Sequence, residues 1–153
     1  MRRILVTALA VSALALAACG SSSDDPPPTT GGSAPAAGGE AAATASACGE
    51  AVAVSKTGAS GFDAGVDNLL KVALEGDEAK TDAAEKEFRA VLTSWSDKLT
   101  ALAAEPVAAD VKAALTEGAA TVKKIADPDD NTPVNAAKEE LAGVADKIGA
   151  ACA

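Results

Sequence analysis

The sequence predicts an all-α protein, an antiparallel up-down four-helix bundle that is preceded by a disordered tether. From Cys48 onward, apolar residues recur at spacings of three and four in successive segments, as on the buried face of a helix. Residues 20–47, by contrast, are mainly Gly, Ser, Ala, Pro and Thr, which cannot form a core. Alanine, the best helix former, supplies 40 of the 153 residues, and aromatic residues supply only 2%. Helices of this composition can approach one another closely.

The first 18 residues have the organisation of a signal peptide. Two arginines precede an uncharged apolar run over residues 4–17, and this run is too short to cross a bilayer as a helix, which takes about 20 residues. The run leads into Leu16-Ala17-Ala18-Cys19, followed by a Gly-Ser tract. These four residues resemble the lipobox of bacterial lipoproteins, and the resemblance implies that residues 1–18 are removed and that Cys19 is lipidated. The alternatives are an ordinary signal peptide with an incidental cysteine, or a short anchor.

The charge of the chain limits its partners. Residues 1–18 carry two of the 13 basic residues and none of the 22 acidic ones, so the remaining chain has a formal charge of about −11. This charge argues against binding of nucleic acid or of anionic lipid headgroups by the body of the domain. We therefore expect the protein to contact the membrane only through the lipid. Residues 19–47 are expected to form the anchor site and a flexible tether, and residues 48–153 the bundle domain.

The first helical segment is expected to run from Cys48 to about residue 75, where Gly76-Asp77 stops it. Three glycines interrupt it, and each costs roughly 1 kcal/mol inside a helix. We therefore expect either a long helix with a break near residues 56–61 or two short helices. The glycines are Gly58, Gly61 and Gly65, and the inward stripe is Val66, Leu69, Leu70, Ala73 and Leu74, continued backward through Phe62 to Cys48.

Three further helices are expected over residues 82–104, 106–126 and from about 133 to the end of the chain. Thr81 is the expected cap of the first of these, and Pro106 suits the first position of the second, where no amide hydrogen is needed. Thr132-Pro133 is expected as N-cap and first residue of the last. The main inward residues are Phe88, Val91, Leu92, Trp95, Leu99 and Leu102; Val107, Val111, Leu115, Gly118, Val122 and Ile125; and Val134, Ala137, Leu141, Val144, Ala145 and Ile148.

Two cysteines remain once Cys19 is assigned to lipid. In an up-down bundle the start of the first helix and the end of the fourth lie at the same end, and Cys48 and Cys152 occupy these two points on inward stripes. Disulfides persist in exported proteins. We therefore expect a Cys48–Cys152 disulfide at the membrane-facing end, with Cα atoms about 4.4–6.8 Å apart. Two free buried thiols are the alternative.

The residue types present exclude several chemistries. The chain has no histidine and no tyrosine, which rules out Ser-His-Asp and Cys-His sites and histidine-ligated zinc or haem. It has no phosphate-binding or dinucleotide-binding glycine loop. Pairs of carboxylates are expected on solvated helix faces rather than in an acid–base site. We expect no catalytic residue, no cofactor and no enzyme activity, and we expect Trp95 to pack in the core rather than to line a ligand site.

One acidic stretch has partial calcium-loop spacing. Asp127, Asp129 and Asn131 match positions 1, 3 and 5 of such a loop, but Thr132 replaces the required glycine and Lys138 replaces the bidentate glutamate. We expect a turn here and no metal site.

The combination of a lipobox, a tether and an alanine-rich helical domain with a cysteine near each end resembles small lipoproteins of high-GC Gram-positive, actinobacterial type. The resemblance implies a diacylglyceryl group on Cys19 and an extracytoplasmic location at the cell membrane. It supplies no functional residue within 48–153. We expect a non-catalytic interaction or spacer module with an envelope protein as its partner. The alternative is a carrier or sensor of a lipid or other apolar molecule, which an internal cavity above roughly 300 Å³ would favour.

Overall fold

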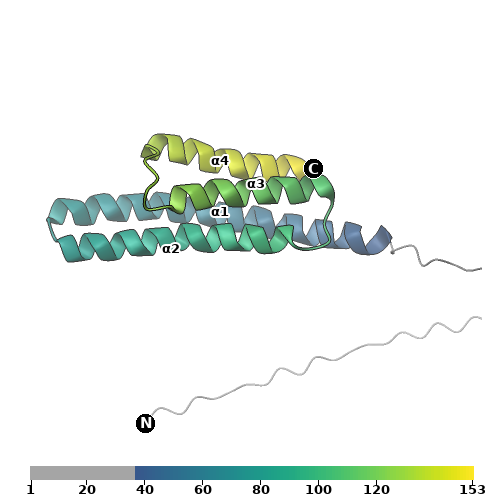
Figure 1. Cartoon of the computed structure of the whole chain (residues 1–153), viewed down its shortest axis with the longest axis horizontal. Helices are drawn as coiled ribbons and strands as arrows, with labels where there is room; N and C mark the ends of the chain where they lie inside the picture. The colour runs from purple at the N-terminus through teal and green to yellow at the C-terminus, as the bar shows by residue number, and fades with distance from the viewer. Residues whose placement is uncertain (1–36) are drawn as a thin grey trace, which may run out of the picture. The chain divides into compact units, whose positions relative to one another are not determined.

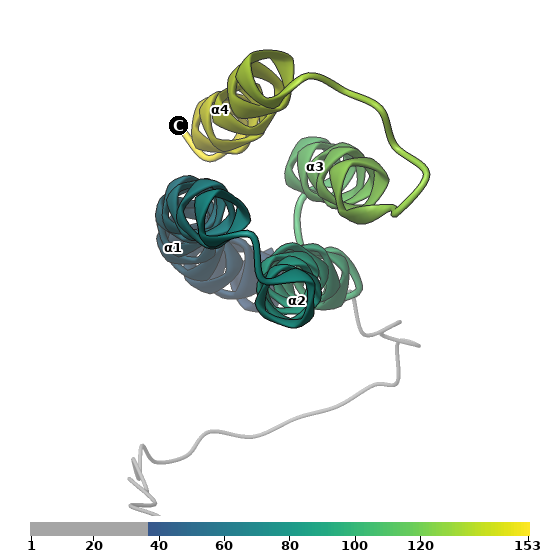
Figure 2. The ribbon, with the colours of Figure 1, turned by 90° about the vertical axis from the view of Figure 1, so that its left-hand side faces the viewer.

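The computed structural model describes residues 37–153, which form four α-helices and no strand. The helices are α1 (Ala37–Glu75), α2 (Glu78–Ala103), α3 (Ala109–Ala126) and α4 (Val134–Ala151). Successive helices run in opposite directions (Figure 1), and each packs chiefly against its two neighbours in a ring that closes from α4 back to α1 (Figure 2). The predicted up-down four-helix bundle is confirmed. The predicted signal peptide, Cys19 and the tether up to residue 36 lie outside the described residues.

Helix α1 is continuous over 39 residues, so the predicted break near residues 56–61 is wrong. Gly58, Gly61 and Gly65 lie where side chains of α2 press against the α1 backbone. A Cβ on Gly58 would lie 2.2 Å from Cδ2 of Trp95, and a Cβ on Gly65 would lie 2.2 Å from Cδ2 of Phe88. The missing side chains therefore let two aromatic rings pack directly on α1. This packing offsets the low helix propensity of glycine, which was the reason for expecting a break.

The N-terminal part of α1 also begins earlier than the predicted start at Cys48. The helix starts at Ala37, and Ala47 is buried at 1% exposure. One turn before Cys48, the Oγ1 of Thr44 accepts a hydrogen bond of 2.9 Å from the backbone N–H of Ala108. Residues 37–47, which were predicted to belong to the tether, are thus part of α1, and the buried Ala47 and the hydrogen bond from Ala108 to Thr44 attach them to the bundle.

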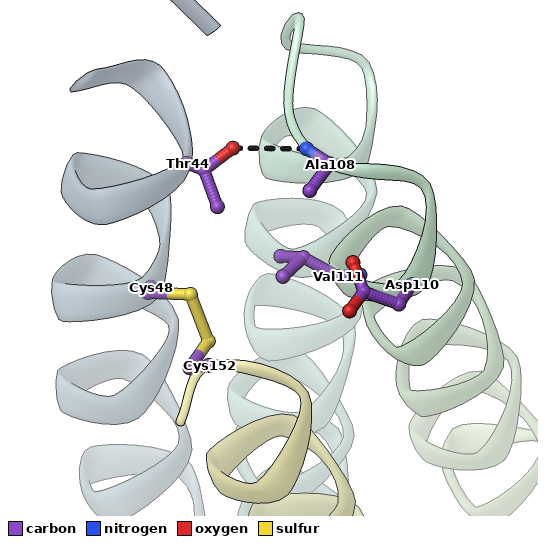
Figure 3. Close-up of a disulfide and its surroundings, with 6 residues drawn as sticks. All are labelled: Thr44, Cys48, Ala108, Asp110, Val111 and Cys152. Carbon is purple, nitrogen blue, oxygen red and sulfur yellow. Dashed lines mark hydrogen bonds between the residues drawn. A yellow bond between two sulfur atoms is a disulfide. The ribbon is translucent and has the colours of Figure 1, made fainter. Parts of the chain in front are cut away.

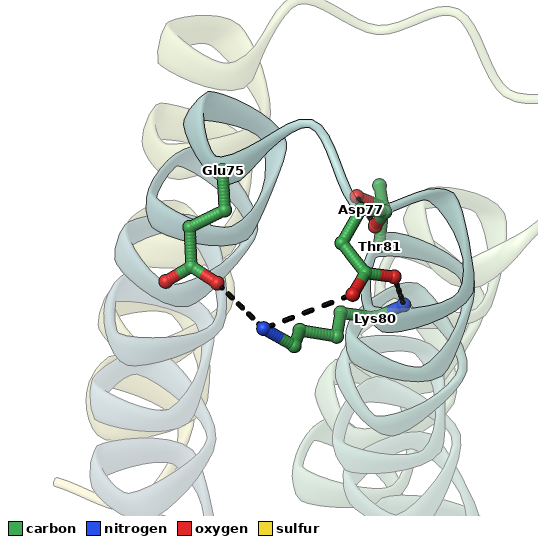
Figure 4. A network of polar contacts seen from close by, with 4 residues as sticks. All are labelled: Glu75, Asp77, Lys80 and Thr81. Atoms are coloured by element: carbon green, nitrogen blue, oxygen red, sulfur yellow. Dashed lines mark hydrogen bonds and ion pairs between the residues drawn. The ribbon is translucent and has the colours of Figure 1, made fainter.

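The turn between α1 and α2 corrects the predicted cap of α2 (Figure 4). Gly76 ends α1 with a φ of 72°, a conformation that favours glycine. Asp77 is the N-cap, because its side chain accepts a hydrogen bond from the N–H of Lys80, whereas the hydroxyl of Thr81 donates to the carbonyl of Asp77. The ammonium of Lys80 also pairs with Glu75 at 3.0 Å, joining the two helices across the turn.

The two later helices begin a little downstream of their predicted starts. Pro106 is not the first residue of α3, which starts at Ala109, because the chain first turns Val107 into the core at 8% exposure. Thr132 does not cap α4: its hydroxyl donates to Asp130, and Pro133 precedes the first helical residue, Val134. Both differences are small, and helix ends are the part of a helix that local sequence determines least.

The core follows the predicted stripes of α2, α3 and α4 at most positions, but Val91 on α2, which was predicted to face inward, is 39% exposed. Trp95 is 2% exposed, as expected for a core residue. A Cβ on Gly118, an inward residue of α3, would lie 2.9 Å from Cγ1 of Val144, so α4 approaches α3 closely at this glycine. The largest fully buried apolar side chains are Leu92, Leu99, Val111, Leu115, Val122, Leu141 and Ile148.

One buried polar group is expected to destabilise this core. The Ser55 side chain is 1% exposed, and its hydroxyl has no hydrogen-bond partner among the described residues. We expect Ser55→Ala to raise the free energy of unfolding by about 1 kcal/mol, because it removes an unpaired buried hydroxyl and introduces a better helix former. Urea unfolding of the oxidised protein measures the effect, and Ser60→Ala at an exposed position of α1 is the matched control. A loss of stability in Ser55→Ala would contradict the prediction.

Candidate functional site

One end of the bundle is closed by a covalent bond. The predicted disulfide between Cys48 on α1 and Cys152, directly after α4, is confirmed, with the two Cα atoms 5.7 Å apart (Figure 3). Both cysteines are half-buried and pack against the core. The Thr44–Ala108 hydrogen bond lies beside the disulfide and ties α1 to the start of α3. This end therefore holds three of the four helices together and is suited to structure rather than to ligand binding.

Cys19, the predicted lipidation site, lies outside the described residues, so lipidation and the orientation of the disulfide end toward a membrane stay predictions. None of the described helices combines the length and the apolar character needed to cross a membrane.

The opposite end of the bundle is open, because α1 and α2 extend past α3 and α4 (Figure 1). Helices α3 and α4 have 18 residues each, against 39 in α1 and 26 in α2. Leu70 is 61% exposed, Leu74 is 90% exposed and Val134 is 52% exposed. The prediction that these three residues face the core is therefore wrong. Leu70 and Leu74 lie on the part of α1 that extends past α3 and α4, and Val134 is the first residue of α4, at the open end of the bundle.

A groove of about 310 Å³ lies at this end, and we call it the distal groove. Its floor includes Phe62 and Phe88, whose ring centroids are 5.4 Å apart. Because Leu70 and Val134 on its walls are more than half exposed, the groove is open to solvent rather than enclosed in the bundle. The other apolar lining residues are Val66, Leu69, Ile125 and Ala137.

The charged residues that line the distal groove are mostly acidic. They comprise Glu85, Asp127 and Asp130, with Arg89 as the single cation among them. The guanidinium of Arg89 is already engaged: its Nε donates to Glu85 at 3.1 Å, and its Nη1 donates to the carbonyl of Ala126 at 3.1 Å. The groove therefore offers a bound ligand an apolar floor and a negative rim.

A second cation near the groove is also paired. Lys138, next to the lining residue Ala137, forms an ion pair of 2.8 Å between its Nζ and Oδ1 of Asp63. The hydrogen bond and the charge of Asp63 raise the pKa of the Lys138 ammonium above its ordinary value, and Asp67 adds to the effect. Lys138 thus stays charged at neutral pH and is held by α1.

Two larger hollows, of about 610 and 570 Å³, lie on the outer face of α1 and α2. Exposed small or charged side chains such as Ala53, Ala90, Ser94 and Lys98 form much of their walls. The first is a surface depression between α1 and α2 and the second lies on α2 alone, so neither is the internal cavity that a carrier of apolar molecules would need.

The acidic residues after α3 form the predicted turn. The Oδ1 of Asp127 accepts a hydrogen bond of 2.9 Å from the N–H of Asp129, and the side-chain amide of Asn131 donates to the carbonyl of Asp129 at 3.0 Å. Within residues 37–153, no three His, Cys, Asp or Glu side chains lie close enough together to hold a metal ion. That this turn binds no calcium stays a prediction.

A scan against protein-family models finds no match for the chain, and comparisons with curated proteins and with solved structures find none either. The distal groove is therefore assessed from its geometry and charge.

Sequence reasoning missed this groove, although a signal was present. The apolar stripe of the first segment continues to Leu74, while the third and fourth segments are visibly shorter than the first. A comparison of segment lengths would have shown that the end of this stripe has no helix opposite it.

Proposed function

We propose that the protein is a lipid-anchored, non-catalytic interaction module of the cell envelope. Cys19 attaches it to the extracytoplasmic face of the membrane, and the bundle presents the distal groove to another envelope protein. The observation that carries this proposal is the exposed apolar stripe around Leu70 and Leu74. Its residues have the spacing of a buried helix face, but no helix among the described residues packs over them. Exposed apolar patches of this kind mark interaction sites in soluble domains.

The open shape of the distal groove favours a protein partner over the alternative, a carrier of an apolar molecule. Small-molecule sites have about 300–1,000 Å³ and bury most of the ligand, so a groove of about 310 Å³ with half-exposed walls is at the lower limit. A passive spacer, in turn, has no need of such a groove.

The position of the groove along α1 fits attachment at the other end. With a rise of 1.5 Å per residue, Leu70 lies about 50 Å along the helix axis from Ala37, where α1 begins. The chain from Cys19 enters the bundle at Ala37, so the groove lies at the end of the bundle remote from this point of entry.

The anchoring part of the proposal is tested by Cys19→Ala. We expect this variant to move from the membrane fraction to the soluble extracytoplasmic fraction, because a single lipid attachment site is lost and no described helix replaces it. Cell fractionation with immunodetection measures the distribution, and Ser60→Ala, at an exposed position of α1 that leaves the lipobox and the disulfide intact, is the control. Retention of Cys19→Ala in the membrane fraction would contradict lipid anchoring.

The interaction part is tested by photo-crosslinking in cells. A photoreactive residue in place of Leu70 is expected to form adducts with a protein, whereas the same residue at Ala113, exposed on α3 near the disulfide end, is expected to form few. Electrophoresis and mass spectrometry identify the adducts. Adducts with lipid alone at position 70 would support the carrier alternative, and equal adducts at both positions would contradict a specific interaction.

A further inference from the structure

We propose that the distal groove binds one amphipathic α-helix of a partner protein, with an apolar face of about two turns and with lysine or arginine on its flanks. This inference rests on the proposed interaction function and names the class of partner. It follows from the length of α1 that is left uncovered and from the charge around it.

The uncovered part of α1 has the length of a short helix. Lys138 is the fifth residue of α4 and pairs with Asp63 on α1. Because α1 and α4 are antiparallel, the first residue of α4 lies near the level of residue 67, and the remainder of α1 up to Glu75 is about 12 Å long. This length corresponds to about two helical turns.

The apolar residues on this part of α1 are spaced to receive a helix. Leu69, Leu70 and Leu74 lie on this part, and Val66, Leu70 and Leu74 recur every four residues. Val66, Leu69 and Leu70 line the groove, and the more exposed Leu74 lies one turn beyond Leu70. Val134, at the first residue of α4, borders the same groove. A partner helix placed end to end with α4 would therefore continue the packing of the bundle over Leu70 and Leu74.

The charges select a basic partner. Three cations near the groove are already paired: Arg89 with Glu85, Lys138 with Asp63, and Lys80 with Glu75 and Asp77. Lys71, beside Leu70 on α1, is exposed, but it does not line the groove. Asp127 and Asp130, which line the groove, have no ion pair among the described residues, because their carboxylates accept only local hydrogen bonds. Lysine or arginine flanking an apolar face would complement them. A second copy of this chain would instead bring the same carboxylates together.

The test uses the full chain carrying Cys19→Ala, which lacks the proposed lipid and keeps every described residue. The probes are two fluorescent helix-forming peptides with leucine at positions i, i+3, i+4 and i+7, one with lysine and one with glutamate at the flanking positions. We expect saturable binding of the lysine peptide, at least about tenfold tighter than the glutamate peptide and weakened by salt. Fluorescence anisotropy measures both affinities.

Variants at the groove locate the binding. Leu70→Ser with Leu74→Ser is expected to weaken binding of the lysine peptide by at least about tenfold, and these exposed positions should leave the circular dichroism spectrum and the unfolding midpoint unchanged. Val91→Ser, at an exposed valine outside the distal groove, is the matched control and should change binding less than about twofold. Asp127→Asn with Asp130→Asn is expected to remove most of the preference for lysine over glutamate.

Several outcomes would overturn the proposal. Equal affinities for the two peptides, absence of peptide binding, or binding that the Leu70 and Leu74 substitutions do not change would each exclude a basic helix in this groove. Self-association in analytical ultracentrifugation that these substitutions abolish would assign the groove to a second copy of the chain. If the peptide experiments fail but photo-crosslinking at position 70 yields a protein adduct in cells, the proposed interaction function is retained and only the basic helix is excluded. If no protein adduct forms at position 70, the interaction function itself is contradicted.

Discussion

Cys152→Ser is expected to lower the free energy of unfolding by about 4 kcal/mol. The disulfide closes a loop with a sequence separation of 104 residues, and the chain-entropy model assigns roughly 4–5 kcal/mol to a loop of this size. The loss is large because a small domain has only about 5–15 kcal/mol of net stability. The bond also fixes the N-terminal part of α1 against the end of α4, and loss of that contact adds to the effect.

Urea unfolding of oxidised wild type, reduced wild type and the two single variants measures this contribution. Cys48→Ser should match Cys152→Ser, and the double variant should be no less stable than either, because the interaction is lost completely with the first substitution. A loss of less than about 1 kcal/mol in both single variants would mean that the bond adds little constraint to the unfolded chain.

Gly58→Ala is expected to destabilise the bundle by about 2–3 kcal/mol, although alanine is the better helix former. The new Cβ would lie 2.2 Å from Cδ2 and 2.3 Å from Cε3 of Trp95. The indole is 2% exposed, so α1 and α2 must separate or the ring must leave its position. Overpacking of a core typically costs about 1–3 kcal/mol, more than the gain of about 1 kcal/mol from helix propensity.

Other glycines provide the controls for this prediction. Gly49→Ala and Gly143→Ala place a Cβ with nothing within 4 Å, so each is expected to raise the free energy of unfolding by about 0.5–1 kcal/mol. The change in the free energy of unfolding for Gly61→Ala should lie between the loss expected for Gly58→Ala and the gain expected for Gly49→Ala. The new Cβ would contact Cγ1 of Val91, a partly exposed side chain that can rotate. Thermal and urea unfolding give the values, and a Gly58→Ala protein as stable as Gly49→Ala would contradict the close packing of α1 on Trp95.

Local sequence information was sufficient for the helices, their order and the disulfide. The stripes containing Leu92, Leu115 and Leu141 predict three amphipathic helices, because a spacing of three and four places residues on one face whatever the neighbouring helices are. The up-down order follows from short connections, and this order brings Cys48 and Cys152 together. These inferences need only the period of the helix and the connectivity of the chain.

The continuity of α1 and its early start depended on tertiary contacts. Gly58 and Gly65 reduce helix propensity, but the rings of Trp95 and Phe88 on α2 use the space that they leave. Ala37–Ala47 resembles a linker in composition, yet Thr44 bonds to Ala108, 64 residues away. Propensity is a local quantity of a few tenths to about 1 kcal/mol per residue, and such contacts override it.

By itself, the sequence determined the four helical segments, the side that each turns inward and the pairing of two cysteines. Only the tertiary structure decided which parts of those inward faces are covered. Leu70 and Leu99 belong to equally regular apolar stripes, but Leu99 is fully buried and Leu70 is 61% exposed. The difference arises because burial requires a second helix at the same level along the bundle, and α3 and α4 end before they reach Leu70.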